Sequence, residues 1–176
     1  MDENNYRLNE LIKRIADVDA QAQVDFLHEY GKLIKCAAIS ASGKVLSDEV
    51  LSLVFEKIVV NAKSFAKKEI TTCWLYKLTV NVAKNVAKKE GFFYKVHQPL
   101  SDEAATYYCS IEEEKSLSRL DFERVMRILN DDEKKIITMK CVYELTFTQI
   151  ADELKKPVST ISTQYYGALD KVKKHF

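Results

Sequence analysis

Apolar residues recur every three or four positions along most of the chain. The pattern runs through residues 6–36 and returns in 47–60, 74–89 and 116–174, and this spacing matches the 3.6-residue period of an amphipathic α-helix. Gly (4) and Pro (2) are scarce among the 176 residues, whereas a sheet protein of this length needs many turns rich in both. We therefore predict an all-α fold.

Polar residues predict where the N-terminal helices begin. Asp19 divides the pattern in residues 6–36 into two helices and can cap the second of them. Ser47 is expected to cap a third helix, with Asp48 and Glu49 in its first turn, where the helix dipole favours acids. These signals predict three helices before a polar loop, NAKSFAKKEITTC.

Capping signals are clearer in the C-terminal part. Asn130 or Asp131 ends one helix and caps the next. Thr146 and Gln149 form a capping box, T-x-x-Q, at the start of another. Pro157 suits the first turn of the last helix, because no helix uses the N–H group that proline lacks there. The last two helices, joined by a tight turn, predict a helix-turn-helix.

The acidic segment 91–115 interrupts the helical pattern. It carries two basic and five acidic residues, whereas residues 1–90 carry 14 and 12 and residues 116–176 carry 11 and 9. An acidic strip between two mildly positive helical blocks is typical of a linker. We predict an N-terminal helical domain (1–92), an acidic linker (93–115) and a C-terminal helix-turn-helix domain (116–176).

Composition narrows the function classes. The net charge is only +1, so any contact with nucleic acid must come from local patches. The four cysteines and three histidines are widely spaced, without the pairing that metal sites need, and no Gly-rich phosphate loop or nucleophile motif occurs. The acidic start and the lack of a long apolar run predict a soluble, cytoplasmic protein. We expect no enzymatic activity, no cofactor and no metal.

A basic face is predicted on the helix that follows the polar loop 61–73. Residues 77–89 contain four lysines and no acid, and most of its polar residues fall opposite the apolar stripe. The pattern alone fits a solvated outer face of a core helix. It also fits a face that contacts phosphates through lysine and bases or sugars through asparagine. The candidate DNA-binding residues are Lys77, Asn81, Lys84, Asn85, Lys88 and Lys89.

The helix-turn-helix raises a second candidate. In this motif the N-terminal part of the second helix reaches base edges, yet residues 157–169 hold no Lys or Arg. Hydroxyl and amide side chains can still read bases, Gln in particular pairing with adenine, while lysines beside the helix hold phosphates. A simple helical hairpin in a small bundle fits the pattern equally well. The candidate residues are Lys155, Lys156, Ser159, Thr160, Ser162, Thr163 and Gln164, with further lysines at 171, 173 and 174.

In this order and at these separations, the segments resemble bacterial RNA polymerase sigma factors of the extracytoplasmic-function (ECF) type. WLYKLTVN is similar to the family's WLyrIArN, and LTFTQIADELKKPVSTISTQYYGAL to its LsyeEIAeiLgisvgTVksRlsrAl. Two family glycines are replaced, by Val18 before the second helix and by Lys155 at the helix-turn-helix turn. The matching residues are Trp74, Leu75, Tyr76, Asn81, Ile150, Ala151, Leu154, Thr160, Ile161, Ala168 and Leu169.

The resemblance implies a transcription initiation factor that binds core RNA polymerase and promoter DNA, with an anti-sigma factor as a further candidate partner. It implies that the helix at 47–60 binds polymerase, and its candidate residues are Glu49, Ser52, Leu53 and Glu56. Ser52 and Leu53 replace the family's Gln-Glu pair. It also implies that a loop at about 64–72 captures a flipped promoter base, with Phe65 either as a wall of that pocket or as part of the core.

Two alternatives stay open on sequence alone. The chain could be a helix-turn-helix regulator that binds duplex DNA without recruiting polymerase. It could also be an interaction module that occupies polymerase or a regulator without reading DNA, which the uncharged second helix favours.

Overall fold

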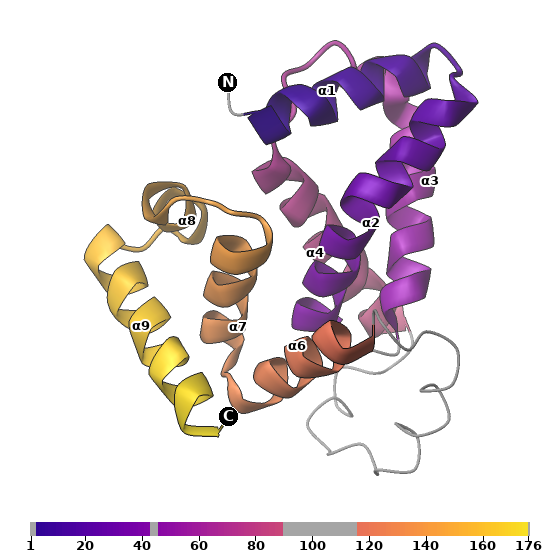
Figure 1. Ribbon diagram of the computed structural model, residues 1–176. Coiled ribbons are helices and arrows are strands. Elements are labelled where there is room, and N and C mark those ends of the chain that lie inside the picture. The colour runs from indigo at the N-terminus through magenta and orange to yellow at the C-terminus, as the bar shows by residue number, and fades with distance from the viewer. Residues whose placement is uncertain (1–2, 43–45, 90–115, 176) are drawn as a thin grey trace.

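The structure, a computed structural model, describes residues 3–42, 46–89 and 116–175, and every regular element in these ranges is helical (Figure 1). The prediction of an all-α fold is confirmed. The predicted linker, 93–115, lies outside the described residues. The elements are α1 (Glu3–Ala16), α2 (Ala20–Ser42), α3 (Ser47–Phe65), α4 (Thr72–Lys89), α6 (Ser116–Ile128), α7 (Asp131–Ile137), the π-helical turn η3 (Thr138–Val142), α8 (Phe147–Leu154) and α9 (Val158–His175).

Helices α1 to α4 share one hydrophobic core. Phe26, Ile34 and Ile58 are fully buried in it, and Phe26 stacks on Phe55 with ring centroids 6.2 Å apart. Burying aliphatic and aromatic side chains of this size stabilises each by roughly 1.5–3 kcal/mol relative to exposure. The predicted apolar stripes therefore face inward and form a four-helix unit.

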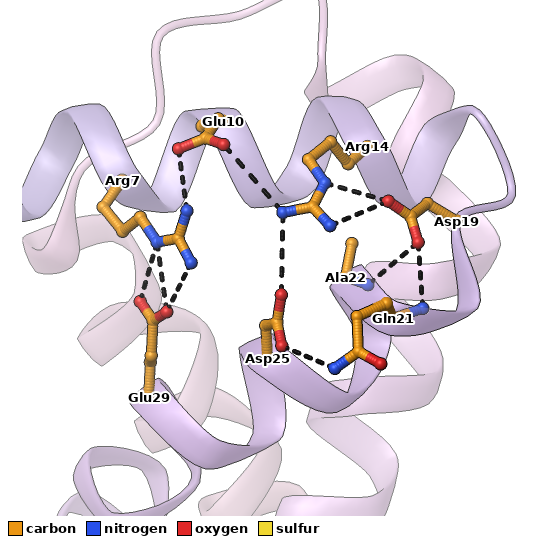
Figure 2. A network of polar contacts seen from close by, with 8 residues as sticks. All are labelled: Arg7, Glu10, Arg14, Asp19, Gln21, Ala22, Asp25 and Glu29. Carbon is orange, nitrogen blue, oxygen red and sulfur yellow. Dashed lines mark hydrogen bonds and ion pairs between the residues drawn. The ribbon is translucent and has the colours of Figure 1, made fainter.

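Charged side chains connect α1 to α2 and to the turn between them (Figure 2). Arg7 binds Glu29 of α2 with an N···O distance of 2.7 Å, and Arg14 binds Asp19 at 2.9 Å. The second oxygen of Asp19 accepts hydrogen bonds from the backbone N–H groups of Gln21 and Ala22. The prediction that Asp19 caps the second helix is confirmed, and Arg14 holds the cap in place.

The expected boundaries of α3 are wrong at both ends. Ser47 is the first helical residue rather than the cap, and its hydroxyl is buried without a hydrogen-bond partner. The helix continues to Phe65, because the apolar stripe extends through the buried Ala62 to Phe65, whose ring meets Trp74 edge-on at 4.9 Å. The polar residues within 61–65 lie on the outer face of the helix. The connection between α3 and α4 is therefore shorter than predicted and comprises residues 66–71.

The capping predictions of the C-terminal block are confirmed. Asn130 accepts from the backbone N–H of Glu133, and the Glu133 side chain accepts from the Asn130 N–H in return. Thr146 and Gln149 form the same reciprocal pair before α8. Each box satisfies donors that a helix N-terminus otherwise leaves unpaired, so α7 and α8 start at residues set by the sequence.

The two helical blocks pack against each other. The buried residues Ala37 of α2 and Tyr76 of α4 share a core cluster with Ile136, Met139 and Tyr143 of the second block. Tyr143 and Tyr76 meet edge to face at 5.2 Å. Figure 1 shows α7 beside α2 and α4, with α9 on the outer side. We call this contact the seam.

Three non-glycine residues have a positive φ: Val18 (64°), Glu144 (55°) and Lys155 (52°). This region costs an L-residue roughly 1–2 kcal/mol, and most for a β-branched side chain such as valine. Val18 is also 78% exposed, so no packing offsets the strain. The chain therefore keeps a left-handed turn after α1 without a glycine.

We predict that Val18→Gly stabilises the protein by about 1 kcal/mol, because glycine adopts a positive φ without strain. Urea unfolding of the variant and the parent protein measures the difference. Val60→Gly is the matched control: Val60 is 74% exposed in the interior of α3, so glycine there should destabilise by about 0.4 kcal/mol, the difference between the helix propensities of valine and glycine. Equal loss of stability in both variants would contradict the strain at Val18.

Candidate DNA and polymerase interfaces

The basic face of α4 is open to solvent. Leu75, Val82 and Val86 are buried on the opposite side of the helix, in the N-terminal core. The exposed residues of this face are the six predicted ones, Lys77, Asn81, Lys84, Asn85, Lys88 and Lys89. The structure therefore brings them together along one helix, as the helical spacing requires.

Lys77 differs from the other lysines of this face because it reaches across the seam. Its ammonium group lies 2.6 Å from a carboxylate oxygen of Glu153 in α8, and the Glu153 side chain is only 17% exposed. The hydrogen bond from Lys77 to Glu153 raises the pKa of the lysine. Among the described residues, Lys84, Lys88 and Lys89 have no ion-pair partner.

Cys73 lies beside the same carboxylate. Its thiol is 3.6 Å from Glu153, and burial together with that negative charge raises its pKa to about 11. The thiol therefore stays neutral at physiological pH and adds a weak donor to Glu153. Within the described ranges, no three His, Cys, Asp or Glu side chains gather as a metal site would need, and no helix has the length and apolar character to cross a membrane.

The predicted polymerase-binding residues line the outer face of α3. Glu49, Ser52 and Glu56 are exposed, and the Ser52 hydroxyl donates to the backbone carbonyl of Asp48. Leu53 is half-buried and packs against the N-terminal core, so only part of its side chain is open to a partner. Val60, 74% exposed one turn further on, extends the face and adds apolar area that periodicity did not single out.

Phe65, which could have lined a base pocket, packs against Trp74 and the N-terminal core. The connection after it, residues 66–71, presents Lys67, Lys68 and Glu69 to solvent and buries Ile70. The exposed tip of this connection, rather than Phe65, is the part open to a ligand.

The helix-turn-helix is formed by α8, a left-handed Lys155 and α9. Lys155 has φ 52° and ψ 44° and closes α8 where the sequence has no glycine. At the start of α9, Ser159 and Thr163 are exposed, whereas Thr160, Ser162 and Gln164 are half-buried. An open recess of about 260 Å³ is lined by Ser159, Thr160, Thr163 and Gln164. These four residues of its lining are uncharged, in keeping with the sequence.

Gln164 carries an unmet hydrogen-bonding group. Its side-chain oxygen is buried and has no hydrogen-bond partner. Leaving such an acceptor unsatisfied costs roughly 1–3 kcal/mol. A rotation that brings the amide to the surface would relieve this cost and point both donor and acceptor at a ligand.

Two of the lysines expected to hold phosphates are already paired. Lys156 lies 2.7 Å from Asp132, and Lys171 lies 2.5 Å from Glu133. The hydrogen bonds from Lys156 and Lys135 hold the pKa of Asp132 below its usual range. Burial alone would raise the pKa of Glu133, but the hydrogen bonds from Lys171 and the Asn130 N–H lower it. Sequence spacing could not foresee these pairs, because their partners lie 24 and 38 residues away.

Comparisons with known proteins agree with this arrangement. A family model described as "Sigma-70, region 4" matches residues 125–174, which include the helix-turn-helix. The chain is 23% identical over 175 residues to the ECF RNA polymerase sigma factor SigW of Bacillus subtilis (strain 168), covering 93% of each protein. Among solved structures, CnrH in complex with the cytosolic domain of CnrY matches the fold with a TM-score of 0.61 and 16% identity, covering 94% of each chain.

We predict that the pairing of Asp132 with Lys156 makes stability depend on acid pH. Because the folded pKa of Asp132 lies below its value in the unfolded chain, the pair stabilises above about pH 4 and is lost as pH falls through the lower, folded pKa. The effect should stay below about 1 kcal/mol, since the Asp132 side chain is 46% exposed. Asp132→Asn should be less stable than the parent near neutral pH and equally stable near pH 2.

Urea unfolding at several pH values measures this convergence. Asp170→Asn controls for the loss of one negative charge, since Asp170 is exposed on α9 and has no ion-pair partner among the described residues. A stability gap between Asp132→Asn and the parent that is the same at pH 2 and pH 7 would contradict the pairing.

Proposed function

We infer that this chain is a sigma factor of the ECF type, a transcription initiation factor that directs core RNA polymerase to promoters. The observation that carries this conclusion is the similarity to SigW along 93% of both chains, together with the region 4 match over the helix-turn-helix. A regulator that shared only a helix-turn-helix would resemble such a factor over its C-terminal third alone. The alternatives without polymerase recruitment are therefore not favoured.

The two helical blocks would divide the work. Residues 1–92 would bind core polymerase and the promoter element nearest the start site, and residues 116–176 would bind the distal element. Supporting this division, the exposed face of α3 and the basic face of α4 both belong to the first block, and the helix-turn-helix belongs to the second. The acidic residues 93–115 would lie in a positively charged channel of the polymerase.

Polymerase would dock on the outer face of α3. Glu49 and Glu56 offer charge, and Leu53 and Val60 offer apolar contact. A mixed surface of this kind fits an interface whose apolar centre is surrounded by polar groups. The exposed valine supports the idea that apolar contacts replace the polar pair at Ser52 and Leu53.

Promoter DNA would meet the basic face of α4 and the start of α9. Lys84, Lys88 and Lys89 supply salt-dependent contacts with phosphates, and Asn81 and Asn85 can bond bases or sugars. On α9, the hydroxyls of Ser159 and Thr163 are exposed, and Gln164 can pair with adenine once it turns outward. Because α9 lacks the arginine that reads guanine, A·T pairs should be preferred in the distal element.

A regulatory protein could hold the factor inactive. CnrH, which shares the fold, was solved in complex with the cytosolic domain of CnrY. We propose by analogy that an anti-sigma factor binds this chain. Co-expression with candidate binding proteins, followed by recovery of a one-to-one complex that no longer associates with polymerase, would test this partner.

The central test is assembly with core RNA polymerase followed by run-off transcription. The purified protein should co-elute with core polymerase and start transcripts at discrete sites on fragments of its own genome. Failure of both assays would overturn the proposed function. Binding to duplex DNA alone with no effect on polymerase would instead favour the helix-turn-helix regulator.

We predict that replacing Lys84, Lys88 and Lys89 together by alanine weakens promoter binding by the holoenzyme and makes it less sensitive to salt. Each lost phosphate contact should lower the slope of log K against log[salt] by about 0.9, so the triple variant should lose at most about 2.7 from the slope. Salt titrations of binding to one promoter fragment measure it. The control replaces Lys13 and Lys32, which are exposed on α1 and α2, and the change in slope is compared per lysine replaced. An equal change per lysine in the two variants would contradict a specific role of α4.

We also predict that Ser162→Ala with Gln164→Ala changes which distal elements the holoenzyme uses, while assembly with core polymerase is unchanged. The reason is that both residues lie on the half-buried edge of the reading face of α9. Selection of binding sites from a random pool measures the change. If the double variant selects the same sites as the parent protein, α9 does not read bases through these residues. A G-rich distal element selected by the parent would contradict the expected A·T preference.

A further inference from the structure

Resting on the proposed function, we propose that Asn5 and Asn9 of α1 are positioning residues: they hold the 66–71 loop, between α3 and α4, in the shape that meets promoter DNA. Neither residue contacts a proposed ligand itself. Both are buried, with 8% of their surface exposed. Helix α1 lies outside every interface described above. Through these two residues it would take an indirect part in promoter recognition.

Asn9 binds both backbone groups of one loop residue. Its amide nitrogen donates to the Ile70 carbonyl at 2.6 Å, and its side-chain oxygen accepts from the Ile70 N–H at 2.9 Å. The same nitrogen also donates to the Asn5 carbonyl, one turn earlier in α1, at 2.7 Å. Only a carboxamide supplies the donor and acceptor that this pairing needs, so the buried asparagine is matched to the loop backbone.

Asn5 fixes the point where the loop enters α4. Its side-chain oxygen accepts from the backbone N–H of Thr72, the first residue of that helix, at 2.8 Å. Thr71 completes the start of the helix, because its hydroxyl accepts from the Trp74 N–H at 3.2 Å. The two asparagines thus define the path of the chain from the end of the loop into α4, residues 70–72.

This anchoring decides which residues the loop presents. Ile70 is 3% exposed and packs in the N-terminal core, so the segment before it must bulge outward. Lys67, Lys68 and Glu69 are exposed at this tip. The loop leads directly into α4, so its tip is continuous in sequence with the basic face. A tip that is already held in one conformation loses less conformational entropy when it binds an unpaired strand than a mobile tip does.

Helix α1 is held in place independently of the two asparagines. Leu8, Leu11 and Ile12 are buried in the core. Arg7 binds Glu29, and the Tyr30 hydroxyl donates to the Asn4 carbonyl at 3.0 Å. Replacing Asn9 should therefore release the loop while α1 remains docked, so the variant can be tested as a folded protein.

The test compares Asn9→Ala with the parent protein in two measurements. Hydrogen exchange should rise at least tenfold at the Ile70 amide in the variant, because the Asn9 side chain accepts the hydrogen bond from this amide. Holoenzymes are then compared on one promoter, first as a duplex and then with the region near the start site already unpaired. Formation of the open complex on the duplex should fall about tenfold, since opening requires an unstacked base to be held at a cost of a few kcal/mol.

On the unpaired template the defect should shrink to within about threefold, because the opening step no longer has to be driven by the protein. Tyr30→Phe is the matched control: it removes one side-chain hydrogen bond to the backbone of α1 without touching the loop, and it should transcribe both templates like the parent protein. Asn9→Asp replaces the donating nitrogen by an acceptor that faces the Asn5 and Ile70 carbonyl oxygens in a buried site, so it should be at least as defective as Asn9→Ala.

Each outcome is decisive. Unchanged exchange at Ile70, or equal losses on the duplex and the unpaired template, would overturn the positioning role and leave the proposed function intact. Equal losses in Asn9→Ala and Tyr30→Phe would show a general effect of loosening α1 and would also overturn it. An inactive parent protein that does not bind polymerase would overturn the proposed function, and this inference with it.

Discussion

The seam between the two helical blocks depends on Tyr143. Only 3% of the surface of this residue is exposed. Its hydroxyl donates a hydrogen bond to the Leu33 carbonyl of α2 at 3.1 Å. Burial raises the pKa of this tyrosine, so the hydroxyl stays a donor at any physiological pH. A buried hydroxyl without a partner would cost roughly 1–3 kcal/mol. The bond therefore restricts how the second block can sit on α2, and the ring contact with Tyr76 adds α4 to the same contact.

That contact has an electrostatic consequence. Once η3 packs on α2 and α4, the neighbouring α8 brings Glu153 to Lys77. One lysine of the basic face is then neutralised from the other block, while Lys84, Lys88 and Lys89 stay free of such pairs among the described residues. The basic face of α4 is thus uneven: its N-terminal end is tied to α8 through Glu153, whereas the lysines at its C-terminal end have no such pair among the described residues. A phosphate that approaches Lys77 must compete with a largely buried carboxylate.

Local sequence signals predicted local structure well. The capping pairs at Asn130 and Thr146 act within four residues, and the left-handed turn at Lys155 follows from the resemblance at a position where the related factors have glycine. The prediction that Ser47 caps α3 is wrong because the helix begins one residue earlier than expected. Leu46 is at the cap position, and Ser47 lies inside the helix. The ion pairs of Lys156 and Lys171, the seam and the hydrogen bonds of Asn9 join segments 24 to 110 residues apart. Periodicity carries no information about such pairs, so the sequence predicted that the polar residues of the basic face lie together along α4 but not the contacts that modify this face.

The same pairs bear on how an uncharged helix can read DNA. With Lys156 and Lys171 bound to Asp132 and Glu133, the helix-turn-helix has even less free positive charge than its sequence indicates, and under the proposed function it would bind DNA weakly on its own. A factor tethered to polymerase can tolerate this, because contacts made elsewhere keep the second block near the promoter at high effective concentration. Under the proposed function, non-specific attraction would come mainly from α4, and the hydroxyl and amide groups of α9 would contribute selection between bases rather than affinity. Weak intrinsic binding would be an advantage in this arrangement, because the second block alone would not hold the factor on DNA that lacks a complete promoter.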